Sequence, residues 1–221
     1  MKLINVLSTE FVKKLYHRKG RWKVNLKKFN KDKWFDGVYN SLGWRVKKSP
    51  GDPLKYDPKL EEKLKDEIFE LIYSFPDEKE KIDLWYKKTI IFISKEYPFN
   101  MGRSQKLINL LIKYFITSYY SGHVIQPISK KLVNHINKIH IPIDNIVLKE
   151  SYKQGNSFKN FITNDGQFRK GMWSIENGNN GWTNWEGPYS DYEKFQIKIR
   201  EKRKELFYNS SLEFEMKELW E

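Results

Sequence analysis

The sequence predicts an all-α, mostly helical protein. Between residues 57 and 150, apolar residues recur at spacings of three and four, the period of an amphipathic helix. Hydrophobic residues make up 39% of the chain and aromatic residues 16%, which is enough for a folded core. No internal repeat is visible, and the expected loops are short except for a Gly- and Trp-rich loop at 154–188.

The first two predicted helices follow from this spacing. One runs from Pro58 to Phe75, and its apolar positions are Leu60, Leu64, Ile68, Leu71, Ile72 and Phe75. Asp77 is placed to cap a second helix, which continues to about Glu96, with acidic residues in its first turn that complement the helix dipole.

A break at residues 97–102 separates the second helix from a third, which we expect to begin near Arg103. Its run SQKLINLLIKYFITSYY is apolar almost all round, so this helix should be buried on most sides. Further helices are expected at 128–139, 145–152, 190–206 and 212–220.

The positive charge is concentrated in two regions. The chain carries a net charge of +13, of which residues 1–56 contribute +11, 57–100 contribute −3, 101–150 contribute +5 and 151–221 contribute 0. A general bias toward Lys is one explanation, but the last 71 residues balance, which bias alone does not predict. Aromatic residues interleaved with the basic ones near residue 20 favour nucleic acid over a membrane as the partner.

The absence of cysteine from the sequence excludes disulfides, thiolate zinc sites, cysteine nucleophiles and cysteine-held iron–sulfur clusters. No two of the four His residues have the spacing of a helical zinc site, and no Gly-rich phosphate loop follows a strand. We therefore expect no metal and no cofactor. No apolar run approaches the ~20 residues of a membrane span, so we expect a soluble, cytoplasmic monomer with no membrane partner.

Two features could carry chemistry. Lys106, Asn109, Lys113 and Thr117 form a narrow polar stripe on the otherwise apolar third helix; a solvent-facing stripe is the structural alternative. Asp144 follows a proline and precedes a predicted helix, so it could equally be an ordinary N-cap.

Taken together, these features resemble the helix–hairpin–helix DNA glycosylase superfamily over about residues 85–150. The matching segments are a loop ending in Met101-Gly102-Arg103, then Ser-Gln-Lys-Leu-Ile-Asn opening a buried helix, and later Pro-Ile-Asp144-Asn-Ile-Val. The resemblance implies two helical lobes around a cleft, a DNA-binding hairpin at 101–103, Lys106 as the Schiff-base lysine and Asp144 as the catalytic carboxylate. Asn100 replaces the first Gly of the usual hairpin, and the 38-residue gap between Lys106 and Asp144 is similar to the archaeal oxoguanine glycosylase branch.

The resemblance and the charge pattern together define the expected site. A carboxylate can stabilise the positive charge that develops on the sugar, and a buried lysine amine can attack the sugar carbon. Reaching the base requires flipping it out of the stack into an aromatic-lined pocket. We expect double-stranded DNA to contact Asn100, Met101, Gly102, Arg103, Ser104, Gln105, Lys113, Arg18, Lys19, Arg21 and Lys23, and the base to contact Trp173, Trp182, Trp185 and Asn109.

The sequence thus predicts a DNA glycosylase, with or without strand-cleaving lyase activity, in repair or in defence against modified phage DNA. A non-catalytic DNA- or RNA-binding module remains the alternative, and a helical protein–protein adaptor is a third. We expect residues 1–221 to form a single compact unit, with a basic part at 1–56, a helical lobe at 57–150, and the loop and C-terminal helices at 151–221.

Overall fold

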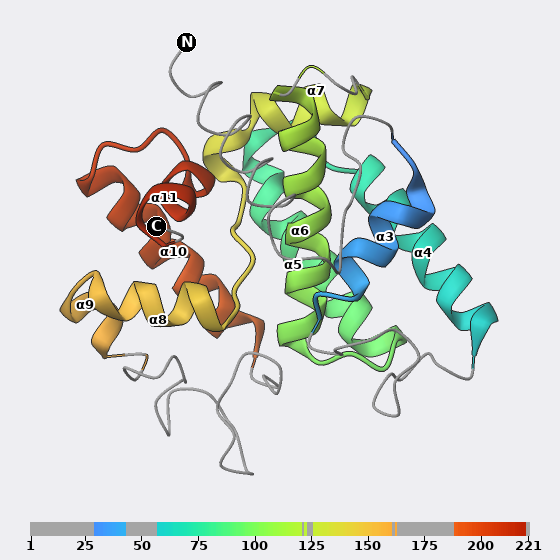
Figure 1. The fold of residues 1–221 in the computed structure, drawn as a ribbon, viewed down its shortest axis with the longest axis horizontal. Helices are drawn as coiled ribbons and strands as arrows, with labels where there is room; N and C mark the ends of the chain where they lie inside the picture. The colour runs from blue at the N-terminus through green and yellow to red at the C-terminus, as the bar shows by residue number, and fades with distance from the viewer. Residues whose placement is uncertain are drawn as a thin grey trace. The chain divides into compact units, whose positions relative to one another are not determined.

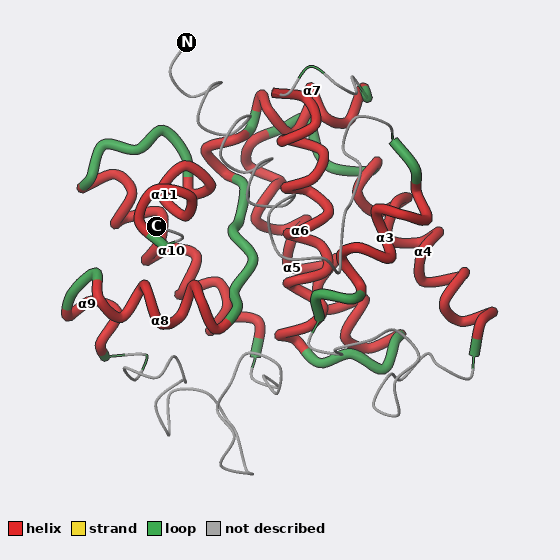
Figure 2. The backbone as a smooth tube through the Cα atoms, viewed as in Figure 1, coloured by secondary structure: helices red, strands yellow, loops and turns green. Residues whose placement is uncertain are grey.

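The structure of the protein is a computed structural model, and it describes residues 29–42, 57–120, 122, 126–160, 162 and 188–219. Within these ranges every regular element is a helix and there is no strand (Figure 1, Figure 2). The predicted mostly helical class is therefore confirmed.

The elements keep the labels of Figure 1. In chain order they are α3 (Lys31–Tyr39), α4 (Pro58–Tyr73), η2 (Lys79–Lys81), α5 (Ile82–Glu96), α6 (Met101–Tyr120), α7 (Pro127–Asn134), η3 (Ile136–Lys138), α8 (Asn145–Lys153), α9 (Asn156–Lys159), α10 (Tyr189–Glu205) and α11 (Ser211–Glu218).

Helix α4 buries the apolar face that its sequence spacing predicts. Its apolar positions Leu64, Ile68 and Ile72 are fully buried, as the spacing predicts. The helix begins at Pro58, and the side-chain oxygen of Asp57 accepts a hydrogen bond from the backbone N–H of Leu60 at 2.8 Å. Proline in the first turn and an aspartate N-cap are the usual signals of a helix start.

Three predicted boundaries are corrected by the structure. Asp77 does not cap the second helix, because the 3₁₀ turn η2 precedes α5 with Glu78 at its N-cap; the Asp77 carboxylate instead pairs with the Lys131 ammonium at 3.1 Å. Helix α6 begins at Met101, before Arg103, so the predicted hairpin residues lie in its first turn. The helix predicted at 128–139 ends at residue 134 and is followed by η3.

The chain divides into two compact units, which are described separately. The first comprises Met1–Trp85 and Leu107–His135, and the second comprises Tyr86–Lys106 and Ile136–Glu221. The division falls inside α5 and inside α6. The boundaries drawn from the sequence at residues 56 and 150 stay predictions.

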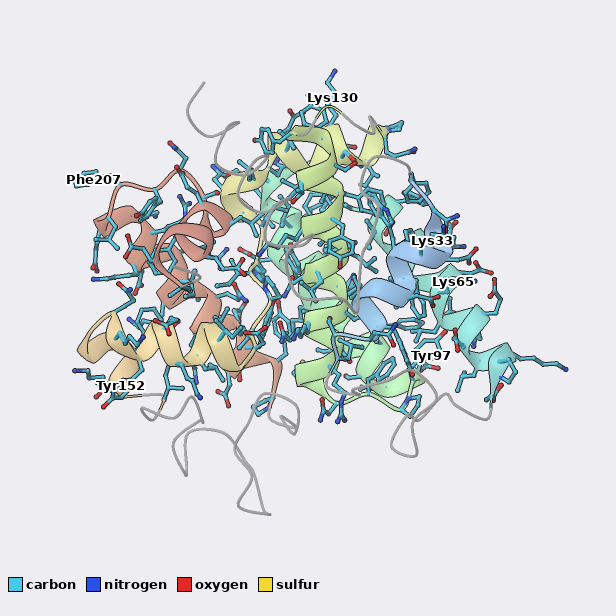
Figure 3. The ribbon with its side chains drawn as sticks, viewed as in Figure 1. Lys33, Lys65, Tyr97, Lys130, Tyr152 and Phe207 are labelled. Carbon is cyan, nitrogen blue, oxygen red and sulfur yellow. The ribbon has the colours of Figure 1, made fainter. Side chains whose placement is uncertain are left out.

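Aromatic side chains form much of the core of the first unit. Trp34 of α3 contacts Phe115 of α6 at a ring-centroid distance of 5.1 Å, Phe29 at 5.1 Å and Tyr114 at 5.9 Å, all in edge-to-face geometry. Edge-to-face contacts stabilise such clusters beyond the burial of area alone. Salt bridges at the surface join α3 to α4: Lys31 pairs with Asp66, and Lys65, labelled in Figure 3, pairs with Asp32 and with Glu62 in its own helix.

The core of the second unit contains polar as well as apolar side chains. The rings of Tyr86 and His140 stack at 3.8 Å, and His140 Nδ1 lies 2.8 Å from the Tyr192 hydroxyl. All three residues are buried, and Phe158 and Phe195 pack beside one another at 5.8 Å. Helix α11 packs against α10 and η3, so the C-terminal helices close this unit.

Among the described helices, none combines the length and the apolar character that crossing a membrane requires.

Candidate active site

Asn100, at the end of the loop between α5 and α6, accepts hydrogen bonds from the first turn of α6. The Asn100 side-chain oxygen accepts a hydrogen bond from the N–H of Arg103 at 3.0 Å, and its carbonyl accepts from the N–H and the hydroxyl of Ser104 at 3.0 and 2.9 Å. Two of the predicted DNA-binding residues, Asn100 and Ser104, thus fix the start of α6.

An open pocket of about 510 Å³ lies beside this loop in the second unit. Its lining includes two aromatic rings and one guanidinium group. The lining residues are Ser94, Tyr97, Pro98, Phe99, Asn100, Met101 and Arg103. The pocket therefore combines flat apolar surface, hydrogen-bonding groups and positive charge at one end of α6.

The polar stripe of α6 is buried along its length. Lys106 is 8% exposed, Asn109 0%, Lys113 1% and Thr117 1%, so the solvent-facing alternative is wrong. Charged side chains are rarely buried unless they are paired, which makes this face of α6 unusual for a structural helix.

Lys106 and Asp144 face each other inside the second unit. The Lys106 Nζ lies 3.3 Å from Asp144 Oδ2, although the two residues are 38 positions apart, and their side chains are only 10% and 13% exposed. The pair therefore joins the first turns of α6 to the N-cap of α8, and both side chains are largely buried.

The two carboxylate oxygens of Asp144 have different partners. Its Oδ1 accepts hydrogen bonds from the N–H groups of Ile146 and Val147 at 3.0 and 3.1 Å, which is the geometry of a helix N-cap. Its Oδ2 is the oxygen that faces Lys106. The N-cap predicted as an alternative is present, and it holds the carboxylate toward the lysine.

The electrostatics keep Asp144 ionised. Burial by itself raises the pKa of this carboxyl group, but the Lys106 ammonium and the N–H groups of Val147 and Ile146 outweigh burial, so the pKa lies below its ordinary value. Asp144 is consequently a carboxylate at neutral pH.

Gln105 has a role that the sequence did not predict. Its side-chain oxygen accepts a hydrogen bond from the Ile143 N–H at 3.0 Å, and its amide NH₂ donates to the carbonyls of Ile143 at 2.8 Å and Gly102 at 2.9 Å. The side chain is fully buried. A contact between Gln105 and DNA stays a prediction.

Several predicted site residues lie outside the described part of the chain. They are the basic residues Arg18, Lys19, Arg21 and Lys23 and the aromatic residues Trp173, Trp182 and Trp185. Within the described residues, no three His, Asp or Glu side chains are grouped to hold a metal ion.

Comparison of the chain with protein-family models, with curated proteins and with solved structures finds no significant match.

The arrangement brings an ionised carboxylate and a primary amine group together where both side chains are largely buried. A carboxylate of this kind can stabilise a developing cation, and an amine released from its ion pair can act as a nucleophile. Lys106 and Asp144 are therefore suited to the cleavage of a bond whose transition state carries positive charge on carbon.

Proposed function

We propose that the protein is a DNA glycosylase that excises a damaged or modified base, with Asp144 and Lys106 as its catalytic residues. The observation that carries the proposal is the contact of 3.3 Å between Lys106 Nζ and Asp144 Oδ2, both nearly buried. The sequence resemblance to helix–hairpin–helix glycosylases assigns catalytic roles to the same two residues. The proposal includes the fold of that superfamily, in which two helical lobes flank a cleft.

The pair has the charges that the reaction needs. Breaking the N-glycosidic bond places positive charge on the sugar, and an ionised Asp144 stabilises that charge. Because the pKa of Asp144 lies below its ordinary value, the carboxylate is available in this form at neutral pH.

Lys106 supplies the nucleophile when the enzyme also cleaves the strand. The target sugar separates the ion pair, Nζ loses a proton to water, and its lone pair attacks C1′. The C1′–N bond breaks, and its electron pair leaves with the base, which takes up a proton. Nζ then loses a proton, the C1′–O4′ bond breaks as O4′ takes up a proton, and a protonated imine joins Nζ to C1′. A proton leaves C2′, the C3′–O bond breaks and its electron pair leaves with the 3′-phosphate, and water hydrolyses the imine to release Lys106. In an enzyme without lyase activity, water attacks C1′ in place of Nζ.

Binding of the DNA backbone is assigned to the loop before α6. The N-terminus of a long helix favours phosphate, and Arg103 adds a positive charge to the pocket beside it. The net charge of +5 over residues 101–150 supports the same orientation of the polyanion.

The first experiment is a screen of the purified protein on duplexes with oxidised, deaminated, alkylated or sugar-decorated bases, including phage-type modified cytosines. Release of a base from at least one duplex is expected. For a lyase, borohydride should trap a covalent complex in the wild type and in Lys149→Gln, an exposed lysine of α8, but not in Lys106→Gln. The enzymatic proposal fails if none of these duplexes loses a base.

The net charge of +13 also supports binding without catalysis, as a second candidate function. A non-catalytic module predicts steep salt dependence of DNA binding and no effect of Asp144→Asn on any DNA-processing readout. The same duplex panel separates the two functions, because only the glycosylase releases a base.

A further inference from the structure

The segment that leads to Asp144 is buried and runs as an extended loop between η3 and α8 (Figure 2). Residues 139–144 connect η3 to α8 without helical structure, and His140, Ile141 and Ile143 are at most 1% exposed. An extended buried segment cannot satisfy its own backbone N–H and C=O groups, so other parts of the protein must supply the hydrogen bonds.

Two glutamines supply these hydrogen bonds at alternate residues. Gln105 of α6 accepts from the Ile143 N–H at 3.0 Å and donates to the Ile143 carbonyl at 2.8 Å. Gln196 of α10 accepts from the Ile141 N–H at 3.1 Å and donates to the Ile141 carbonyl at 2.8 Å. Each amide thus binds one residue through both of its backbone groups, as a neighbouring strand would.

Tyr86 holds His140, the residue that precedes Ile141. The His140 N–H donates to the Tyr86 hydroxyl at 3.2 Å, and the His140 ring stacks on Tyr86. Both glutamines are fully buried, so water does not compete for their hydrogen bonds.

We propose that Gln105 and Gln196 are positioning residues that hold the extended segment in register and thereby set the distance between Asp144 and Lys106. Gln105 is the direct neighbour of Lys106 on α6, and Ile143 is the direct neighbour of Asp144. The Gln105 side chain therefore connects the backbone beside Lys106 to the backbone beside Asp144. A positioning role in catalysis rests on the proposed glycosylase function, whereas the effect on the ion pair does not.

A side-chain amide is the group that this task requires. It presents one acceptor and two donors, so it can satisfy an N–H and a C=O of the same residue at once. Methionine has nearly the same length but makes no comparable hydrogen bond. Gln105→Met and Gln196→Met should therefore keep the volume of the core and loosen the segment.

The test measures the pKa of the Asp144 carboxyl group by carbon-13 NMR in the intact protein. In the wild type, Lys106 from α6 and the N–H groups at the start of α8 hold this pKa below its ordinary value. We expect it to rise in both methionine variants, because the carboxylate moves away from these partners. Ile199→Ala, which removes a buried side chain of α10 one turn from Gln196, should leave the pKa unchanged at a similar loss of stability.

Two further readouts separate positioning from the proposed reaction. If a modified-base substrate is found, each methionine variant should lower the rate of base release about 10²-fold, more than Ile199→Ala does. If a variant does not fold, hydrogen exchange is measured on the wild type in place of the pKa of that variant. The N–H groups of Ile141 and Ile143 should then be strongly protected from exchange. An unchanged Asp144 pKa in folded variants, or rapid exchange at both N–H groups, would overturn the proposal even if the protein proves to be a glycosylase.

Discussion

At the scale of single residues, Asp144 connects the start of a helix to a buried ion pair. Its Oδ1 caps α8 and its Oδ2 faces Lys106, so one side chain both starts a helix and completes an ion pair. Because the two oxygens serve different partners, substitutions can separate the two roles.

Asp144→Asn should keep the cap and remove the charge. Asparagine is as good an N-cap as aspartate, but the substitution removes the negative charge that faces the buried Lys106 ammonium, which costs about 3 kcal/mol of unfolding free energy. Asp57→Asn is the matched control, because Asp57 caps α4 through the Leu60 N–H in the same way. Urea denaturation of both variants measures their free energies of unfolding. An equal loss of unfolding free energy in the two variants would contradict the prediction.

The same carboxylate predicts a pH dependence of stability. The pKa of Asp144 is lower in the folded than in the unfolded state, where it is about 3.9. Its contribution is therefore complete well above pH 4 and is lost as the pH falls through the folded-state pKa. The difference in unfolding free energy between the wild type and Asp144→Asn should shrink below pH 4. A difference that is constant from pH 7 to pH 3 would argue against the ion pair.

A double-mutant cycle measures the pair itself. Combining Lys106→Met with Asp144→Asn should give a coupling of about 1–3 kcal/mol, since both side chains are nearly buried. The exposed pair of Lys153 and Glu150, at 2.6 Å, should give less than about 1 kcal/mol. Equal coupling in the two cycles would show that burial does not strengthen the Lys106 contact.

At the scale of elements, α10 ends in a motif that usually contains glycine. The Tyr208 N–H donates to the Arg203 carbonyl at 2.8 Å and the Phe207 N–H to the Lys204 carbonyl at 3.1 Å, the pattern of a Schellman cap. Phe207 has a φ of 59° there and is 92% exposed, projecting from the end of α10 in Figure 3. Its side chain thus contributes little packing to a strained backbone position.

Phe207→Gly should therefore stabilise the protein. Glycine removes the strain of the positive φ, and the gain, after the entropy that glycine adds to the unfolded chain, should be about 0.5–1 kcal/mol. Phe207→Ala keeps the strain and should change stability by less than about 0.5 kcal/mol. Thermal unfolding of both variants checks this prediction, and a lower midpoint for Phe207→Gly than for Phe207→Ala would refute it.

The elements were predictable where local signals agree. The apolar period predicts α4 to within two residues, and the apolar run of α6 predicts its burial. The cap predicted at Asp77 was wrong because the chain enters α5 through the 3₁₀ turn η2, whose N-cap is Glu78. The apolar period and the acidic first turn do not predict such a turn.

The site was predictable only in part. The resemblance pointed to Lys106 and Asp144, and the structure brings their side chains together. The roles of Gln105 and Gln196 had no sequence signal, because their partners are the backbone groups of Ile143 and Ile141, which every residue carries. Side chains that bind backbone atoms across the fold are visible only in a structure.

At the scale of the whole molecule, the uneven charge predicts how DNA binding depends on salt. The slope of log affinity against log salt becomes shallower by about 0.9 for each phosphate that the protein no longer neutralises. Replacing Arg18, Lys19, Arg21 and Lys23 together by Gln should therefore flatten the slope by about 3–4.

The matched control replaces four basic residues that pair with acidic neighbours on the surface: Lys63, Lys81, Lys153 and Lys198. Fluorescence anisotropy with a labelled duplex at several salt concentrations gives the slopes. A flattening of equal size in both variants would show that net charge alone, and not the basic N-terminal part, determines binding.

We propose that the paired Lys106 and Asp144 form the catalytic site of a DNA glycosylase. The most direct measurement is the single-turnover rate of base release from a modified-base duplex by the wild type, Asp144→Asn and Asp57→Asn, with DNA affinity measured in parallel. We predict that Asp144→Asn lowers the rate by at least about 10²-fold with little change in affinity, and that Asp57→Asn leaves both unchanged. Base release by Asp144→Asn at the wild-type rate, or no release by the wild type from any duplex of the panel, would contradict the claim.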